Sequence, residues 1–283
     1  MAGGMGKRLQ PATQVISKHL FPIYDKPMIY YSMSIFFIAK IKEIIIVADI
    51  DNLQHYKNLF EDGKKFGIKI HYIVQPNPGG IAQGIILSEK LIIGKKVCLV
   101  LGDNILYGSG LAAALEKAKK NKDGATIFAY YVDDPSAYGV ITFDKNNNPK
   151  KIIEKPKKLI SNYAIPGIYF YDKDVLKITK STKKSARNEL EISNVNSIYL
   201  MKKKLNVSIL NRGYAWLDTG TVDNLHAATN FVASIEKRQG LKISCLEEIA
   251  LKNKWITKSV LKKNIDSMSK DSDYAKYLRK IIN

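Results

Sequence analysis

Runs of β-branched and other apolar residues alternate along the first half of the chain with segments of helical periodicity. This alternation predicts a parallel sheet covered by helices on both faces. In such sheets ligands bind at the carboxyl ends of the strands, so residues that follow a strand are the first candidates for chemistry. The pattern predicts strands at 43–48, 68–74, 97–101 and 125–132, and helices at 28–41, 52–61, 81–91 and 111–120.

The second half of the chain has a different pattern. Segments 139–143, 151–154 and 163–171 indicate a strand-rich lobe, and 205–210 adds one more strand. From Thr221 onward the pattern is mainly helical. We therefore expect an α/β domain over 1–220, divided into 1–132 and 133–220, followed by a helical segment over 221–283.

A chain of 283 residues, 46% of them hydrophobic, is long enough to build a sizeable core. No apolar run approaches a bilayer span, and Met1 leads into glycines rather than into a signal peptide. We therefore expect no contact with a membrane. Cys98 and Cys245 show neither CxxC nor metal spacing, so two unpaired thiols fit a reducing, cytoplasmic compartment.

The net charge of +19 could indicate a nucleic-acid binder. Recognition of base edges favours arginine, however, and only five of the 45 cationic residues are arginines. The lysines are also spread along the chain rather than gathered in one stripe with aromatic residues. We therefore interpret the charge as a solvated surface with some attraction for anionic substrates, and we expect no nucleic-acid partner.

Three glycines and two cations open the chain at Gly3, Gly4, Gly6, Lys7 and Arg8. Glycines let backbone N–H groups approach the oxygens of a polyphosphate closely. The spacing does not match a Walker A loop, which needs Ser or Thr where Arg8 stands, or a dinucleotide fingerprint. By itself the segment fits a flexible tail as well as a phosphate loop.

Two aspartates follow short apolar stretches. Asp103 comes just after the strand 97–101, and Asp218 follows Trp216-Leu217. A single carboxylate at a strand end is more often a turn former than a ligand. A pair near a phosphate loop could hold Mg²⁺, which takes one or two carboxylates together with phosphate oxygens and waters.

A charged pair at Glu154-Lys155 ends another strand, because the following Pro156 cannot donate to the ladder. Glu154 could bind sugar hydroxyls and Lys155 a phosphate, although a surface salt bridge explains the pair better in isolation. The loop 75–83 could read a base edge or be a tight turn. Groups of the kind that line carbohydrate sites occur at Tyr138-Gly139-Val140, Arg187-Asn188-Glu189-Leu190-Glu191 and Tyr214-Ala215-Trp216.

In their order these motifs resemble the glucose-1-phosphate thymidylyltransferases over nearly the whole chain. The resemblance implies that dTTP and α-D-glucose 1-phosphate give dTDP-glucose and pyrophosphate, the entry step to dTDP-rhamnose. It also implies a Rossmann-like nucleotide-sugar transferase fold with a mostly parallel central sheet, a nucleotide-binding half and a sugar-binding half. The resemblance is found in eight sequence segments: 2–9, 17–31, 75–83, 101–104, 138–140, 154–156, 167–172 and 214–221.

The resemblance implies roles for single residues at the triphosphate. Gly3, Gly4 and Gly6 would cradle it, Arg8 would hold the leaving pyrophosphate, and Lys18 would neutralise charge around the α-phosphorus. A sugar phosphate oxygen is already a competent nucleophile at neutral pH, so cations and positioning suffice and no general base is needed. We therefore assign the histidines to structure or surface: His19, His55, His71 and His226.

Further roles concern the base, the metal and the sugar. Gln75 and Gly80 would read the thymine edge, Asp103 and Asp218 would hold Mg²⁺ beside the nucleotide, and Lys155 would bind the sugar phosphate. The expected surroundings of the glucose are Tyr138, Gly139, Glu154, Ile165, Tyr169 and Trp216, with Arg187 and Glu189 close by. The tail 221–283 resembles the family segment used in homotetramers with a second nucleotide site that senses the end product.

Three departures from the family pattern stand out. Lys7 replaces a usual Thr, Pro166 replaces a frequent Thr, and the short apolar strand that usually precedes Ala-Gly-Gly is missing. We expect the natural protein to begin upstream of Met1. Two alternatives stay open: a uridylyltransferase that makes UDP-glucose, and a catalytically silent sugar-nucleotide sensor. The presence of all five charged residues of the expected site argues against the sensor: Arg8, Lys18, Asp103, Lys155 and Asp218.

Overall fold

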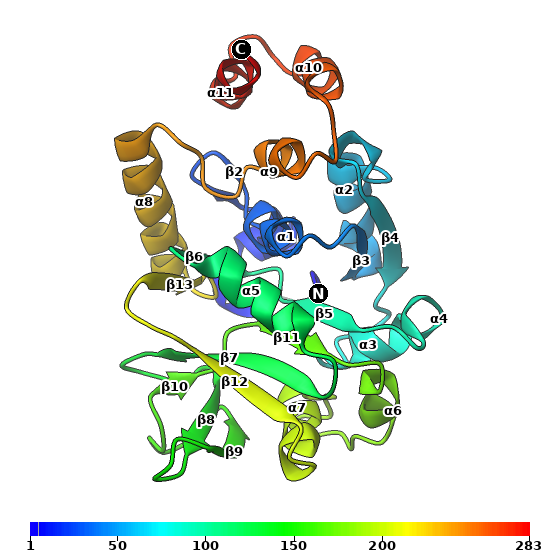
Figure 1. The fold of residues 1–283 in the computed structure, drawn as a ribbon, viewed down its shortest axis with the longest axis vertical. Coiled ribbons are helices and arrows are strands. Elements are labelled where there is room, and N and C mark those ends of the chain that lie inside the picture. The colour runs from blue at the N-terminus through cyan, green and yellow to red at the C-terminus, as the bar shows by residue number, and fades with distance from the viewer. Residues whose placement is uncertain (5) are drawn as a thin grey trace. The chain divides into compact units, whose positions relative to one another are not determined.

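The computed structural model describes residues 1–4 and 6–283, and the chain divides into two units (Figure 1). One unit, here called the sheet unit, contains Met1 and 75–216. The other, here called the helical unit, contains 2–74 and 217–283. The tail 221–283, expected as a separate segment, therefore belongs to the same unit as the N-terminal residues.

The sheet unit is built on a seven-stranded sheet. Its strands follow the order β5-β11-β7-β10-β8-β9, and β12 pairs with β7. Their bounds are β5 (Val97–Val100), β11 (Ile168–Tyr171), β7 (Ala125–Tyr131), β10 (Tyr163–Ala164), β8 (Gly139–Phe143), β9 (Pro149–Glu154) and β12 (Leu205–Leu210).

The predicted mostly parallel sheet needs correction. Among the described residues of this sheet, β12 pairs with β7 in parallel, and the other five pairings are antiparallel. One reason is β11, which runs antiparallel between β5 and β7, with Tyr169 opposite Leu99 and Ile127. Another is the short β8–β9 turn, where the Asp144 carboxylate accepts from the backbone of Asn146 and Asn148, since so short a connection can join only antiparallel strands.

Helices and one further strand pair complete the sheet unit. The expected helix 81–91 is divided into α3 (Gln83–Leu87) and α4 (Glu89–Ile92), and the buried Ser88 between them donates its hydroxyl to the Gly84 carbonyl over 2.7 Å. The remaining elements are β6 (Asn104–Gly108), which pairs with β13 (Tyr214–Asp218), and the helices α5 (Leu111–Lys120), α6 (Val175–Lys180) and α7 (Ile192–Met201). The last two residues of β13 belong to the helical unit.

In the helical unit β3 (Glu43–Ala48) pairs in parallel with β4 (Lys69–Val74), and α2 (Ile50–Phe60) lies beside both strands (Figure 1). The Asp49 carboxylate caps α2 by accepting from the Asn52 backbone N–H. The other elements are the short β1 (Pro22–Ile23) and β2 (Lys26–Pro27), and the helices α1 (Ile29–Ile38), α8 (Val222–Gln239), α9 (Leu246–Lys252), α10 (Lys258–Asp266) and α11 (Asp273–Ile282).

One apolar core joins both ends of the chain in the helical unit. Phe37 of α1 and Phe60 of α2 share it with Leu246 of α9, Leu261 of α10 and Leu278 of α11. The tail therefore stabilises the N-terminal half of this unit by burying the same apolar surface. None of the described helices is long and apolar enough to cross a bilayer.

Candidate active site

The glycine loop of the helical unit begins at a fixed residue. Ala2 is buried, and its N–H donates to the Val47 carbonyl in β3 over 2.8 Å. Gly4 and Gly6 have φ angles of 123° and 54°, which side chains rarely adopt. A Cβ on Gly6 would also lie 2.8 Å from Thr13 Cγ2. The path of the loop therefore requires glycine at both positions.

Arg8 and Asp218 lie against the same glycine. A Cβ built on Gly220 would meet the guanidinium of Arg8 and would lie 3.0 Å from Asp218 Oδ2. The absent side chain of Gly220 leaves room for both charged groups. Two residues predicted for the pyrophosphate and the metal are thus neighbours within this unit.

Lys18 begins a short 3₁₀ turn, Lys18–Leu20, and is half-buried between Ser17 and His19, which are both buried. The Ser17 backbone N–H donates to Asn52 Oδ1 of α2 over 2.8 Å. The backbone that carries Lys18 is therefore tied to the first turn of α2.

In the sheet unit the loop 75–83 is closed by its own side chains. The buried Gln75 donates its amide to Gln83 Oε1 over 2.8 Å, and Gln83 Oε1 also accepts from the Gly79 N–H. Gly80 has a φ of 97°, and a Cβ there would lie 2.5 Å from the Leu190 carbonyl oxygen. The Leu190 N–H donates to the Gly79 carbonyl, so the predicted base loop pairs with the backbone beside Glu189.

Asp103 lies next to a buried asparagine that sequence reasoning missed. Asn104 donates its amide to Asp103 Oδ1 over 2.9 Å. Its own oxygen accepts from the Trp216 indole over 2.6 Å and from the Gly167 backbone N–H over 3.0 Å. The Trp216 ring lies 4.8 Å from that of Tyr138, centroid to centroid. Asn104 therefore links the predicted metal ligand to the predicted aromatic wall.

Strand register brings several predicted sugar residues together. Gly139 of β8 stands opposite Glu154 of β9, and a Cβ on Gly139 would lie 3.1 Å from Glu154 Oε2. The Ile165 N–H donates to the Gly139 carbonyl over 2.8 Å. Burial, and to a smaller extent repulsion from Glu191, raises the pKa of Glu154. Burial also raises the pKa of Tyr169, and the negative charge of Glu154 adds to that effect.

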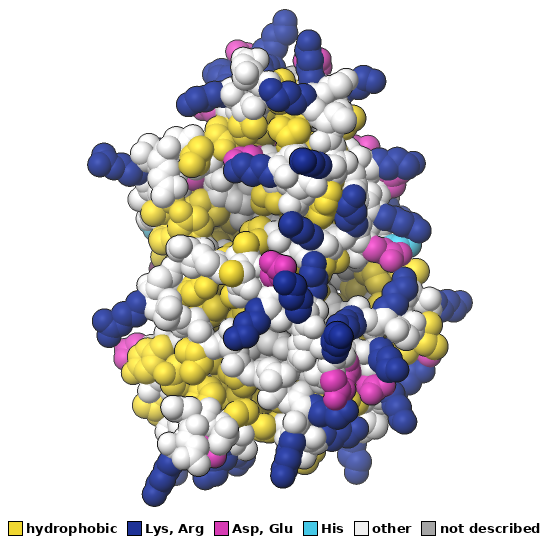
Figure 2. Space-filling model, viewed as in Figure 1, with side chains coloured by type: hydrophobic (Ala, Val, Ile, Leu, Met, Phe, Trp, Pro, Cys, Tyr) yellow, Lys and Arg dark blue, Asp and Glu magenta, His cyan; other side chains and the backbone are white. Residues whose placement is uncertain are grey.

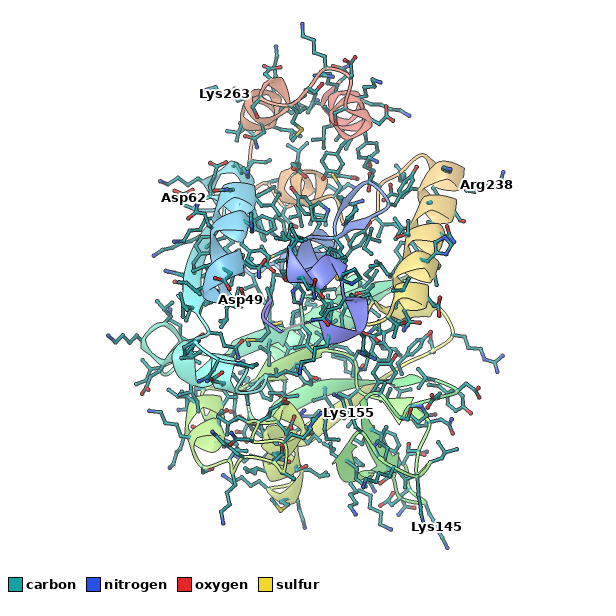
Figure 3. The ribbon with its side chains drawn as sticks, turned by 180° about the vertical axis from the view of Figure 1, so that it is seen from behind. Asp49, Asp62, Lys145, Lys155, Arg238 and Lys263 are labelled. Atoms are coloured by element: carbon teal, nitrogen blue, oxygen red, sulfur yellow. The ribbon has the colours of Figure 1, made fainter. Side chains whose placement is uncertain are left out.

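Lys155 follows Glu154 with an unusual backbone. Its φ is 46°, in the left-handed region, and its N–H donates to the Tyr138 carbonyl over 2.9 Å. The side chain is exposed, at the end of β9 (Figure 3). The role of Lys155 at the sugar phosphate stays a prediction.

Arg187 stands among carboxylates. Its Nε and Nη2 donate to Glu191 Oε1 over 3.2 and 2.9 Å, and Nη2 lies 3.6 Å from Glu154 and 4.0 Å from Glu189. Glu191, 6% exposed, also accepts from the Ser185 hydroxyl. The sequence offered one signal for Glu191, its place in the motif 187–191, but no signal for the fold that buries it.

The described residues contain no group of three or more His, Cys, Asp or Glu side chains placed to hold a metal ion. Mg²⁺ takes only one or two carboxylates when phosphate oxygens and waters complete its shell. On the face drawn in Figure 2, lysine and arginine side chains are scattered, with acidic side chains among them. This distribution agrees with a solvated surface rather than a single basic stripe.

Comparisons with known proteins match this chain along its length. The family model described as nucleotidyl transferase matches residues 1–235. Glucose-1-phosphate thymidylyltransferases of Neisseria gonorrhoeae and Mycobacterium tuberculosis are each 45% identical over 282 residues, covering 100% of this chain and 98% and 97% of the relatives.

Solved structures agree with the fold. A Bacillus anthracis protein, named as a glucose-1-phosphate thymidylyltransferase and solved with a sucrose, is 35% identical with a TM-score of 0.75, over 81% of this chain and 92% of its own. A UDP-glucose pyrophosphorylase solved with UDP-glucose has a TM-score of 0.73 at 24% identity, over 84% of this chain and 97% of its own. At that identity the second likeness concerns the fold alone.

Proposed function

This chain belongs to the glucose-1-phosphate thymidylyltransferase family of nucleotidyl transferases, and from that premise we propose that it makes dTDP-glucose and pyrophosphate from dTTP and α-D-glucose 1-phosphate. The observation that carries the proposal is 45% identity to relatives of that name over essentially their whole length. The expected family is thereby confirmed, while the roles of single residues remain proposals.

The proposed step is an in-line displacement at the α-phosphorus of dTTP. A phosphate oxygen of the sugar phosphate forms the new P–O bond, the bond to the bridging oxygen breaks, and pyrophosphate leaves with that electron pair. Arg8, Lys18 and the backbone of Gly3, Gly4 and Gly6 would hold the triphosphate. Two polyanions must meet in this step, so cations and fixed N–H groups supply the catalysis.

The sheet unit would hold the sugar phosphate and the base. Glu154 is set to accept from sugar hydroxyls, with Gly139, Ile165 and Tyr169 beside it and Lys155 available for the phosphate. Trp216 and Tyr138 would supply the apolar wall. Gln75 and Gly80 would face the thymine, so the choice between dTTP and UTP rests on few contacts.

Mg²⁺, when bound, would neutralise phosphate charge and make the α-phosphorus more electrophilic. By family resemblance its protein ligands would be Asp103 and Asp218. Asn104 donates to Asp103 Oδ1, which would help to orient that carboxylate.

Release of pyrophosphate tests the activity. We expect purified protein to release it from dTTP only when glucose 1-phosphate and Mg²⁺ are both present, and to use dTTP faster than UTP. Faster turnover of UTP would favour the uridylyltransferase. A folded protein that releases none from either nucleotide with several sugar 1-phosphates would instead be the silent sensor.

Two further proposals concern the protein outside its site. We propose a homotetramer that responds to dTDP-rhamnose, with 221–283 contributing to assembly; a mass of one 31.8 kDa chain by light scattering would contradict it. Cys98 and Cys245 are free thiols, which supports the proposed cytoplasmic location.

A further inference from the structure

Helix α2 points two polar side chains at the segment before Lys18. Asn52 and Tyr56 are one helical turn apart and lie on the same face. Asp49, labelled in Figure 3, accepts both from the Asn52 backbone and, over 2.7 Å, from its side-chain amide. Asn52 in turn accepts the Ser17 N–H, so the helix cap extends into the backbone of the Lys18 segment.

The Tyr56 hydroxyl reaches two segments that are distant in sequence. It lies 2.9 Å from Ser17 Oγ and 3.2 Å from the Ala2 carbonyl oxygen. Ala2 leads into the glycine loop, and Ser17 directly precedes Lys18. Tyr56 is fully buried, and burial raises its pKa, so the hydroxyl stays protonated and keeps its single donor.

His19 extends the network. Its Nδ1 lies 2.9 Å from Ser17 Oγ and 3.5 Å from the Tyr56 oxygen. If Nδ1 carries a proton, it donates to Ser17, Ser17 donates to Tyr56, and Tyr56 donates to Ala2. If Nδ1 carries no proton, two arrangements are possible: Ser17 donates to Tyr56 and Tyr56 to Ala2, or Tyr56 donates to Ser17 and Ser17 to His19. In each arrangement where Tyr56 donates to Ala2, its hydroxyl contacts both the start of the glycine loop and Ser17.

We infer that the Tyr56 hydroxyl donates to the Ala2 carbonyl and accepts from Ser17, and that Tyr56 is therefore a positioning residue for the triphosphate: one hydroxyl contacts both the start of the glycine loop and the residue before Lys18. The inference rests on the proposed function, in which these two segments bind the same polyanion. A loop with glycines at 3, 4 and 6 has many alternative conformations, and holding it in place before binding lowers the entropy lost on binding. The Tyr56 ring packs in the core beside Ala2, so its packing is separable from its hydroxyl.

The test is Tyr56→Phe, which keeps the ring and removes the hydroxyl. We expect KM for dTTP to rise about three- to tenfold with KM for glucose 1-phosphate unchanged, as for the loss of one hydrogen bond at the triphosphate side. Ser17→Ala should give the same pattern. The matched control is Tyr72→Phe, which also removes a tyrosine hydroxyl from the helical unit. That hydroxyl contacts the backbone carbonyls of Glu61 and Tyr56 in the second half of α2, so the control tests for a general effect on this helix.

The control should leave both Michaelis constants unchanged, with any change confined to melting temperature. Identical kinetics for the Tyr56 and Tyr72 variants would overturn the inference, as would equal rises in both Michaelis constants for Tyr56→Phe. Calorimetric binding of dTTP with Mg²⁺ makes the test independent of turnover. A wild-type protein that binds dTTP without turnover contradicts the proposed function only, whereas unchanged dTTP affinity in Tyr56→Phe contradicts the role of Tyr56.

Discussion

In the sheet unit predicted sugar residues such as Gly139, Glu154 and Tyr169 stand on paired strands, whereas in the helical unit the predicted phosphate residues stand on loops and short 3₁₀ turns. Gly139 and Glu154 face each other because two strands are in register, and many backbone hydrogen bonds maintain that register. Lys18 and the glycine loop are held by fewer bonds: side chains of α2 such as Asn52 and Tyr56, and one backbone bond from Ala2 to β3. Loss of one side chain should therefore disturb the loops more readily than the strands.

The largest effect we predict concerns the two aspartates proposed to bind Mg²⁺, Asp103 of the sheet unit and Asp218 of the helical unit. Asp103→Asn and Asp218→Asn should each lower kcat about 100-fold or more, because a neutral amide is a poor ligand for a hard cation. Steady-state rates across a range of Mg²⁺ concentrations measure the effect. The exposed Asp123, paired with Lys204, provides the control Asp123→Asn, which should keep the wild-type rate. Normal turnover in either test variant would remove that aspartate from the metal site.

Gly80 tests whether the base loop behaves as a fixed part of the sheet unit. Gly80→Ala would bring a Cβ against the backbone of Leu190 at a φ of 97°. We expect KM for dTTP to rise about tenfold, because the strain, about 1–3 kcal/mol, must be relieved by moving one of the two loops. Initial rates at varied dTTP give this value.

The matched control is Gly94→Ala. Gly94 also has a positive φ, 71°, but a Cβ there would meet no atom within 4 Å. The Gly94→Ala variant therefore has the backbone strain without the steric clash, so its KM for dTTP should equal that of the wild type. A similar loss of dTTP affinity in both variants would show that strain alone matters and that the pairing with Leu190 does not.

Substitution of Glu191 tests whether this carboxylate fixes the Arg187 side chain in the sheet unit. Glu191→Gln should raise KM for glucose 1-phosphate about fivefold, because Arg187 loses its charged partner and turns toward Glu154 or Glu189. The same change removes a like charge from Glu154, so the pKa of Glu154 should fall. Binding of the sugar phosphate, which needs the ionised Glu154, should then be lost at a lower pH than in the wild type. An unchanged pH profile of KM would contradict this coupling.

Local pattern predicted much of the secondary structure. The observed bounds of β3, α5, β8 and β12 equal those expected from the sequence. The error in strand direction came from β11, since a short apolar run looks alike whichever way it pairs. Whether a strand pairs in parallel depends on the path of the connection that leads into it, and hydrophobic periodicity contains no information on that path.

The candidate site was predictable only where a motif marked it. Glycines and a strand-end aspartate pointed to residues such as Gly6 and Asp103, and family resemblance supplied their roles. Asn104 and Tyr56 were not marked as site residues, because their importance lies in partners from distant parts of the chain. Glu191 lies within the motif 187–191, but its burial could not be predicted from that motif. Sequence spacing cannot show a hydrogen bond between Tyr56 and Ala2, whose contact exists only once α2 packs beside β3.

The smallest effect we predict compares two carboxylates with raised pKa values. Glu154 is a predicted sugar residue, whereas Glu247 of the helical unit is buried in the core and accepts from the Tyr274 hydroxyl over 2.6 Å. Burial raises the pKa of Glu247 above its value in the unfolded chain. Its contribution to stability is therefore complete below the unfolded pKa and is lost as the pH rises through the folded pKa.

Glu247→Gln keeps an acceptor for Tyr274 and removes the charge, so its melting temperature should exceed that of the wild type by a few degrees at pH 8. The difference should shrink toward zero as the pH falls to 4, where the wild-type carboxyl is protonated. Thermal unfolding of both proteins from pH 4 to 8 measures it, and turnover at pH 8 should stay the same. A constant difference at every pH would mean that packing around residue 247, and not its ionisation, determines the change.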